Sequence, residues 1–291
     1  MTAIILGASG RLGGVLRRAN ERASGPWLTQ SRGGDADIAW DGRFDALPDG
    51  LFQTGGTLIN MIGAVGPDEG QLTAINVDFT VQLLRAAYAA GVRHVILASS
   101  AAVYGAGHGD PFVETDPMRP VNAYGDSKAR MEDAVHGMAS DLAGMAVTIL
   151  RIANVAGSDA LLASARAHVV RQQPVPLHCF GDGTPPVRSY IGPADLYAEV
   201  KQLVDHPPTG IETVNVTGPE PVDLRQMLDG YRTHLLPTLT WVEHPAPAGV
   251  PSRVVLSADK LQRLVPLPTV ANPADDMARQ VAEDRPDETR L

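Results

Sequence analysis

The chain has almost no cysteine, no long apolar run and no excess of positive charge. Cys179 is the only cysteine in 291 residues, which excludes a disulfide within one chain and fits a reducing compartment. No stretch approaches the roughly 18 apolar residues that a membrane-spanning helix needs, and the N-terminus lacks the basic segment and apolar core of a signal peptide. The formal net charge of −9 argues against a general nucleic-acid-binding protein, which usually carries a basic face. We therefore expect a cytoplasmic protein that binds small molecules and has no nucleic-acid or membrane partner.

The sequence also lacks internal repeats and the spacing of metal ligands. Its histidines show no pairing typical of a zinc site, so we expect no metal. A length of 291 residues allows one large domain or two unequal lobes, and a hydrophobic content of 44% supports a sizeable core.

A short apolar run opens the chain and leads directly into spaced glycines. Thr2-Ala3-Ile4-Ile5-Leu6 predicts a buried strand, and Gly7-Ala8-Ser9-Gly10-Arg11-Leu12-Gly13 follows with the spacing G-x-x-G-x-x-G. In a dinucleotide-binding βαβ unit, Gly7 would allow the tight turn, Gly10 would let the backbone approach a pyrophosphate, and Gly13 would let the helix pack closely. The N–H groups at the helix N-terminus would then face the anion. Taken alone, the three glycines also fit an ordinary strand-to-helix loop.

The end of the next expected strand, near Trp27–Gln30, lacks the acidic residue that would accept hydrogen bonds from the ribose of NAD. Arg32 stands there instead, and a planar guanidinium can pair with a 2′-phosphate in a bidentate way. We therefore expect NADP, with NAD as the alternative; a solvated surface arginine is the other interpretation of Arg32. Arg11 would add to the same positive field, and Asp41 is a candidate for contact with the adenine amino group.

Expected strands and helices alternate to about residue 157, which predicts an α/β fold with a Rossmann-like, doubly wound parallel sheet. The strands are Thr57–Ile62, His94–Ala98 and Ala146–Leu150, the helices are Gln71–Ala90 and Asn122–Leu142, and Thr213–Val216 is a further strand that returns to the sheet. We expect residues 1–157, with a returning segment of about 191–217, to form a dinucleotide-binding domain. Residues 158–190 and 218–291 would form a smaller C-terminal substrate-binding lobe.

A phenol and an ammonium stand four residues apart in the second expected helix, where Tyr124 and Lys128 would share one face. A phenol has a reference pKa of about 10, and a nearby positive charge favours the phenolate and makes it useful as an acid/base. Ser99 and Ser100 fall at the carboxyl end of a strand, where ligands bind in such sheets. We interpret Tyr104 as a packing residue with a tethered hydroxyl and assign it no catalytic role.

Taken together, these motifs resemble the extended short-chain dehydrogenase/reductase family, specifically its NAD-dependent epimerase/dehydratase branch, which acts on nucleotide sugars. Five ordered stretches carry the resemblance: Gly7-x-x-Gly10-x-x-Gly13; Ala90–Ser100 followed by Val103-Tyr104-Gly105; Tyr124-Gly125-Asp126-Ser127-Lys128; Leu150–Gly157; and Phe180–Gly183 with Arg188–Leu196. The match covers most of the first 220 residues.

The resemblance implies a role for each matching position. Tyr124 would be the acid/base, Lys128 would hold the nicotinamide ribose, and Ser100 would polarise the substrate. Asn154 and Arg188 would contact the diphosphate of a nucleotide sugar, although Arg188 also fits a surface position. The expected cofactor-binding residues are Gly7, Gly10, Arg11, Leu12, Gly13, Arg32, Asp41, Ala98, Tyr124, Lys128 and Val155.

The chemistry stays open between two reactions. Sugar 4,6-dehydratases of this family carry an acidic pair where this chain has Ala101-Ala102, so we do not expect dehydration. An NADP preference favours a reductase, whereas the Val103-Tyr104-Gly105 and Asn154-Val155 segments favour an epimerase. A non-catalytic NADP-binding sensor or scaffold is the alternative from another class. The resemblance also implies a homodimer formed through the helices near 71–90 and 122–142.

Overall fold

The computed structural model describes residues 3–53, 55–107, 109–266 and 269–285, so the expected strand residue Thr2 lies outside the described part. The chain divides into two compact units. The first comprises Met1–Gly105, Glu114–Ile152 and Tyr197–Asn215, and the second comprises Ala106–Val113, Ala153–Leu196 and Val216–Leu291.

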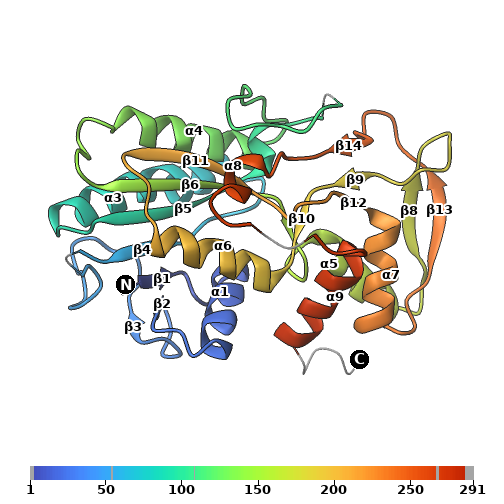
Figure 1. Cartoon of the computed structure of the whole chain (residues 1–291), viewed down its shortest axis with the longest axis horizontal. Helices are drawn as coiled ribbons and strands as arrows, with labels where there is room; N and C mark the ends of the chain where they lie inside the picture. The colour runs from blue at the N-terminus through green and yellow to red at the C-terminus, as the bar shows by residue number, and fades with distance from the viewer. Residues whose placement is uncertain (1–2, 54, 108, 267–268, 286–291) are drawn as a thin grey trace. The chain divides into compact units, whose positions relative to one another are not determined.

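The first unit is built on a sheet of seven strands among the described residues, in the order β11-β6-β5-β4-β1-β2-β3 (Figure 1). The strands are β1 (Ala3–Leu6), β2 (Leu28–Ser31), β3 (Ile38–Ala39), β4 (Thr57–Asn60), β5 (His94–Ser100), β6 (Ala146–Ile152) and β11 (Ile211–Val216). Every residue of β1, β4 and β6 is buried, as expected for parallel strands covered on both faces. Strand β1 pairs in parallel with both β2 and β4, so the strand order reverses around it, and ligands bind at such a switch point.

The predicted return of the chain to the sheet is confirmed by β11. The amide of Val147 donates to the carbonyl oxygen of Gly210, and that of Ala153 donates to Val216. Both residue numbers rise together along the pair, so β11 runs parallel to β6. The prediction of a Rossmann-like α/β fold is therefore confirmed.

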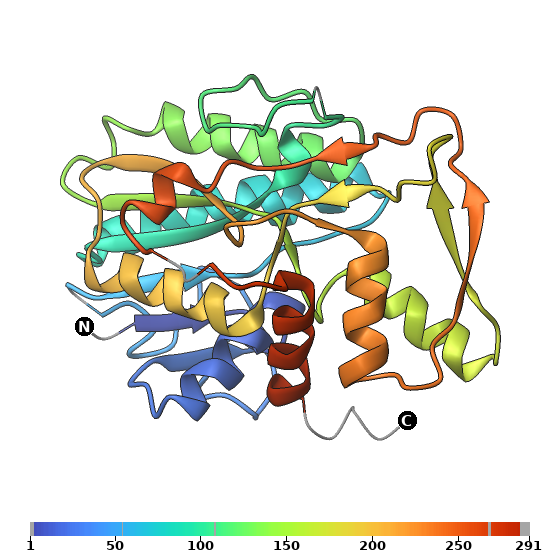
Figure 2. The ribbon, with the colours of Figure 1, turned by 45° about the vertical axis from the view of Figure 1, so that its right-hand side comes forward.

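Helices cover both faces of this sheet (Figures 1 and 2). The helices α3 (Phe79–Ala89) and α4 (Ala123–Gly137) lie on one face, and α1 (Arg11–Arg22) and α6 (Pro193–Asp205) lie on the other. Helix α4 begins after Asn122, whose side chain accepts a hydrogen bond from the Gly125 amide at 2.8 Å. Buried apolar side chains of α3 and α4, such as Leu83 and Val135, share one core with the strands.

The expected helix at 71–90 has a more complex form. It begins as α2 (Glu69–Leu72), continues as the π-helix η1 (Thr73–Asp78) and ends as α3. The side chain of Asp68 accepts a hydrogen bond from the Gln71 amide at 2.9 Å and so caps the first turn. A π-helical turn widens the helix locally and is frequent at functional sites. The expected helix at 122–142 ends earlier, at Gly137.

The second unit consists of short elements. Its strands are β7 (Asn154–Val155), β8 (Val175–Cys179), β9 (Val187–Arg188), β10 (Tyr190–Ile191), β12 (Val222–Asp223), β13 (Trp241–Pro245) and β14 (Arg253–Val254), and its helices are α5 (Ala160–Val170), α7 (Leu224–His234), α8 (Asp259–Gln262) and α9 (Pro273–Asp284). Met227, Tyr231 and Met277 belong to a core of its own. Gly230 lets α7 and α9 approach closely, because a Cβ atom there would lie 2.8 Å from the Ala274 carbonyl oxygen.

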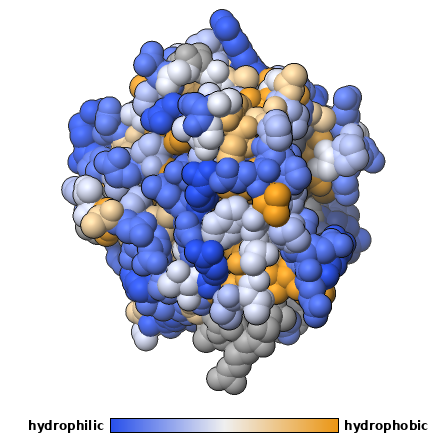
Figure 3. Space-filling model, turned by 90° about the vertical axis from the view of Figure 1, so that its right-hand side faces the viewer, coloured by the Kyte–Doolittle hydropathy of each residue, from blue (hydrophilic) through white to orange (hydrophobic). Residues whose placement is uncertain are grey.

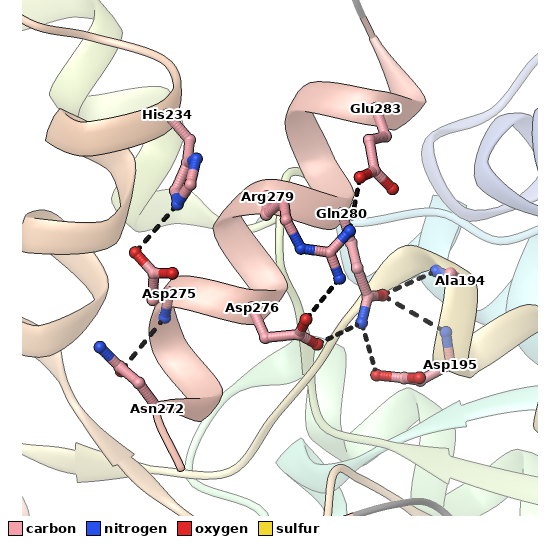
Figure 4. Close-up of polar contacts among 9 residues, drawn as sticks. All are labelled: Ala194, Asp195, His234, Asn272, Asp275, Asp276, Arg279, Gln280 and Glu283. Carbon is pink, nitrogen blue, oxygen red and sulfur yellow. Dashed lines mark hydrogen bonds and ion pairs between the residues drawn. The ribbon is translucent and has the colours of Figure 1, made fainter. Parts of the chain in front are cut away.

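Polar contacts tie the last described helix of this unit to the start of α6 (Figure 4). The Gln280 side-chain oxygen accepts hydrogen bonds from the amides of Ala194 at 3.0 Å and Asp195 at 3.4 Å. Its Nε2 donates to the carboxylates of Asp195 at 2.8 Å and Asp276 at 2.9 Å. The Gln280 amide thus caps the N-terminus of α6. Because it is uncharged, it stabilises the two carboxylates by hydrogen bonding alone.

The face drawn in Figure 3, on the side of β8 and β13, is largely hydrophilic with small apolar groups between the polar ones. Throughout the part of the chain that the structure describes, no helix combines the length and the apolar character needed to cross a membrane.

Candidate active site

The glycine loop packs too closely against its neighbours to allow side chains at Gly7 and Gly13. Gly7 has φ +75°, and a Cβ atom on it would lie 2.9 Å from Cγ1 of Ile62. A Cβ atom on Gly13 would lie 2.1 Å from the Gly7 carbonyl oxygen, so only glycine allows α1 to start this close to the loop. The N-cap residue Gly10 offers no side-chain hydrogen bond, and the first turn of α1 holds no acidic residue. The first amides of α1 are therefore free of side-chain acceptors and suited to an anion.

A cavity of about 330 Å³ lies beside this loop in the first unit. The cavity is lined by Gly7 and Gly10, and at the strand ends by Arg32 and Asp41. Arg11, Leu12 and Gly13 form the first turn of α1 and are not among the residues that line the cavity. Four of the predicted cofactor residues thus line one cavity at the switch point of the sheet.

The part of the cavity near Arg32 and Asp41 has a further charged residue nearby, Arg43, which the sequence did not indicate. The Asp41 carboxylate accepts hydrogen bonds from Nε of Arg43 at 2.8 Å and from its amide at 3.1 Å, and the amide contact is the main cause of the lowered pKa of Asp41. An open depression of about 440 Å³ is lined by Arg32, Asp41 and Arg43 together. Arg43 is a cation that sequence reasoning missed, because its position depends on the turn after β3, where its side chain pairs with Asp41.

Gln30 was also missed as a site residue. Its Oε1 accepts a hydrogen bond from the Gly7 amide at 3.0 Å, and its Nε2 donates to the Trp40 carbonyl at 2.7 Å. The side chain is 2% exposed. A buried amide thus joins the glycine loop to the ends of β2 and β3 and holds that wall of the cavity in place.

The structure brings Tyr124 and Ser100 together. Their side chains share a hydrogen bond, and the positive charge of Arg11 also acts on the phenol. Burial raises the pKa of Tyr124, while the Ser100 contact and then Arg11 oppose that rise. Ser100 also accepts a hydrogen bond from the Ala102 amide at 3.2 Å, which begins the short 3₁₀ helix η2 (Ala101–Val103). The hydroxyl of Ser100 is therefore held at the end of β5.

Lys128 lies one turn after Tyr124 and is 4% exposed. Its Nζ donates a hydrogen bond to the Ala98 carbonyl oxygen at 2.7 Å. Burial lowers the pKa of Lys128 to about 8, and the negative charge of Glu132 opposes this shift. A Cβ atom on Gly63, which lines the cavity, would lie 3.4 Å from this Nζ. The ammonium thus borders the cavity beside the glycine loop.

The π-helical turn places a further polar side chain at this border. Asn76 accepts a hydrogen bond from the Ala64 amide at 2.9 Å and donates to its carbonyl oxygen at 3.0 Å. It also donates to Oγ of Ser127 at 2.9 Å. Asn76 therefore joins the loop after β4 to the turn of α4 that carries Lys128.

The remaining predicted residues lie in the second unit. The Nδ2 of Asn154 donates to the Ser189 carbonyl at 3.1 Å, and Val155 is buried in β7. The guanidinium of Arg188 donates to the carbonyls of Val187 at 2.8 Å and Pro251 at 2.9 Å. Burial lowers the pKa of Arg188. These acceptors are neutral carbonyl oxygens, so they leave the charge of the guanidinium uncompensated.

No group of three or more potential metal-ligating side chains gathers among the residues described.

Comparison with known proteins identifies the family. The model of the family described as "NAD dependent epimerase/dehydratase family" matches residues 3–217. A UDP-glucose 4-epimerase of Streptomyces lividans is 34% identical over 137 residues, which are 42% of this chain and 41% of that protein. A UDP-glucose 4-epimerase of Corynebacterium glutamicum is 29% identical over 207 residues, 65% of this chain and 62% of that protein. The matched stretch thus spans less than two thirds of these relatives' own length.

Solved structures show the same fold. MoeE5 in complex with UDP-glucuronic acid and NAD superposes with a TM-score of 0.79 at 21% identity, over 99% of this chain and all (100%) of that one. A UDP-glucose-4-epimerase of Stenotrophomonas maltophila superposes with a TM-score of 0.79 at 15% identity, over 100% of this chain and 99% of that one. The family match covers well over half of the chain, and the glycine loop and the Tyr124–Lys128 pair lie within it. The chain therefore belongs to the NAD dependent epimerase/dehydratase family.

Proposed function

We propose that the chain is an NAD(P)-dependent epimerase or reductase that acts on a nucleotide sugar or a related hydroxyl or keto substrate. The observation that carries this proposal is the hydrogen bond between Tyr124 and Ser100, one turn of α4 before Lys128, whose ammonium borders the glycine-loop cavity. The names of the relatives, which are sugar 4-epimerases, and the family match support it.

The residues of the first unit fit a dinucleotide. Gly7, Gly10 and the uncapped N-terminus of α1 would hold the pyrophosphate, because the two glycines line the cavity without side chains and leave the first backbone N–H groups of α1 open to an anion. The bound nicotinamide supplies the hydride acceptor and donor of the reaction. Arg32 supports NADP, since a guanidinium suits a 2′-phosphate; Arg43, which pairs with Asp41, lines the same depression. The neighbours crystallised with NAD support the alternative.

Three side chains would handle the proton. Tyr124 Oη removes the proton from the substrate hydroxyl as the carbonyl forms and returns it in the reverse step. Ser100 Oγ donates a hydrogen bond to the same substrate oxygen and so stabilises its developing charge. Lys128 stays buried on the Ala98 carbonyl, where its charge faces the cavity wall at Gly63 and suits a ribose hydroxyl.

We assign substrate recognition to the second unit, where Asn154 and Arg188 would contact a diphosphate by hydrogen bonding and charge. Ala101 and Ala102 offer no group that can shuttle a proton, so the proposal excludes sugar dehydration. The resemblance to the family supports a homodimer through α3 and α4, which sedimentation of the purified chain tests.

The proposal is tested with a panel of substrates that includes UDP-glucose and UDP-glucuronic acid. The absorbance of the nicotinamide is measured during each reaction. An epimerase converts the sugar with no net change in absorbance, and a reductase consumes NADPH in proportion to product. Cofactor binding without conversion of any sugar or carbonyl compound in the panel would contradict catalysis and favour a sensor or scaffold.

A further inference from the structure

A carboxylate buried beneath the catalytic groups has no role in the mechanism above. Glu132 is 0% exposed and lies in α4, one turn beyond Lys128. It accepts a hydrogen bond from the Ser99 hydroxyl, and Arg151 donates to it from Nε at 3.0 Å and from Nη2 at 2.8 Å. Ser99 belongs to β5 and Arg151 to β6, so one carboxylate ties α4 to two neighbouring strands.

The helix and the strand meet residue by residue. Tyr124, Lys128 and Glu132 are spaced four apart, which places them along one face of α4. The phenol meets the Ser100 side chain, the ammonium meets the Ala98 carbonyl, and the carboxylate meets the Ser99 hydroxyl. The last three residues of β5 are therefore each held by one residue of α4.

Arg151 extends this attachment to the segment that follows Ser100. Its Nη1 donates to the hydroxyl of Tyr104 at 2.9 Å and to the Glu114 carbonyl at 3.1 Å, and its guanidinium lies 4.7 Å from the centre of the Tyr104 ring. The Tyr104 hydroxyl donates in turn to Asn215 at 2.7 Å. The short segment from Ser100 to Val103 is thus anchored at Ser99 and at Tyr104, and both anchors depend on the same ion pair.

A buried ion pair gains little stability over apolar packing of the same volume, because both charges lose their hydration. The Glu132–Arg151 ion pair is therefore better explained by the segment that it holds in position, from Ser100 to Val103. We propose that Glu132 is a positioning residue that sets the register between α4 and the end of β5, and so holds Ser100 against Tyr124. The negative charge of Glu132 also lies beside Lys128 and keeps that ammonium protonated. This inference rests on the proposed function of the site.

The charged and titratable groups that contact Glu132 or Arg151 come from several elements. Arg151 of β6 pairs with Glu132 of α4 and donates a hydrogen bond to the Tyr104 hydroxyl after η2. Glu132 supplies the negative charge that acts on Lys128. Replacing it with glutamine keeps the shape and the hydrogen-bonding oxygen but leaves Arg151 as an uncompensated cation nearby.

The test uses the full chain with Glu132→Gln, measured by hydrogen exchange without cofactor and by NADPH fluorescence titration. The amides of Ala102 and Tyr104 should exchange about tenfold faster, because their turn loses its anchors. The loss of NADPH affinity at alkaline pH should begin about one pH unit lower, because Lys128 gives up its proton more readily. Turnover of the nucleotide sugar that the panel identifies should fall about tenfold or more with little change in KM.

Met131→Ala is the matched control, because Met131 is 2% exposed and stands next to Glu132 in α4 but outside the polar contacts. This variant should lower the unfolding temperature. It should leave amide exchange, the pH dependence of NADPH binding and turnover unchanged. Equal shifts in Met131→Ala, or wild-type exchange and pH dependence in Glu132→Gln, would overturn the proposal.

If Glu132→Gln does not fold, the variant Arg151→Lys tests the positioning role instead. It keeps the charge pair but removes the donors to Tyr104, so exchange at Tyr104 should again rise about tenfold. Unchanged exchange there would overturn the positioning role. A wild-type chain that converts no nucleotide sugar would instead contradict the proposed function, and the exchange measurement would still decide the role of Glu132.

Discussion

The Lys128 ammonium donates its hydrogen bond to the carbonyl oxygen of Ala98, at 2.7 Å. Burial raises the pKa of the Tyr124 phenol, and the hydrogen bond with Ser100 and then the positive charge of Arg11, at the start of α1, oppose that rise. The sequence led us to expect the opposing positive charge from Lys128, four residues from the tyrosine. The charge of Arg11 matters for catalysis, because a phenol accepts a proton near neutral pH more readily when its pKa is held down.

Arg11→Gln should therefore raise the pKa of Tyr124 and reduce activity at neutral pH. The fraction of phenolate at a given pH falls when the pKa rises, so the ascending limb of kcat/KM should move to higher pH. A pH–rate profile measures this shift. Arg17→Gln, on the same helix but paired with Glu21 at 2.9 Å, is the control and should leave the profile in place. An unmoved ascending limb in Arg11→Gln would contradict the assignment.

Arg32→Gln should weaken NADPH binding far more than NADH binding. A charge-assisted hydrogen bond is worth about 2 kcal/mol, so the affinity for NADPH should fall by roughly thirtyfold. Fluorescence titration of both cofactors gives the ratio directly. If wild-type chain binds NADH and NADPH equally, or if the variant loses both alike, the case for NADP is wrong.

His94 should make the first unit sensitive to acid. Its Nε2 lies 2.8 Å from the Thr148 hydroxyl, the ring is 1% exposed, and burial lowers its pKa from 6.5 to about 4. Above pH 6.5 the ring is neutral in both states and the full stability is present. Between pH 6.5 and about 4 the unfolded chain binds one more proton at this ring than the folded chain does. The free energy of unfolding therefore falls by about 1.4 kcal/mol for each unit by which the pH is lowered in this range.

Urea denaturation at pH 7, 6 and 5 measures that slope. His94→Gln should flatten it, whereas His206→Gln, at an exposed position, should not. Equal slopes in the wild type and in His94→Gln would show that this ring does not titrate on unfolding.

Gln280→Leu should destabilise the second unit by about 2 kcal/mol, because two amides and two carboxylates lose their partner. Thermal unfolding measures the loss. Arg279→Ala on the same helix removes exposed ion pairs with Asp276 and Glu283, and its effect should stay below about 1 kcal/mol. A larger effect of Arg279→Ala than of Gln280→Leu would contradict the inference that the Gln280 amide, whose contacts Figure 4 draws, is the main connection.

Local patterns predicted much of this molecule. The glycine spacing, the alternation of strands and helices and the Tyr124–Lys128 interval are patterns among residues close in the sequence. They can therefore be recognised from the sequence alone. The pairing of Glu132 with Arg151 is not, because the two residues stand 19 positions apart on a helix and a strand. The second unit resisted prediction for a related reason: strands of two residues, such as β9 and β10, are too short to show any periodicity.

The central claim is that Tyr124 moves the proton of the reaction. Tyr124→Phe removes only the hydroxyl, so the variant should fold and bind NADPH or NADH as the wild type does. We predict that conversion of the nucleotide sugar identified by the panel falls by about 10²- to 10⁴-fold at pH 7. Conversion at the wild-type rate in this variant would contradict the account.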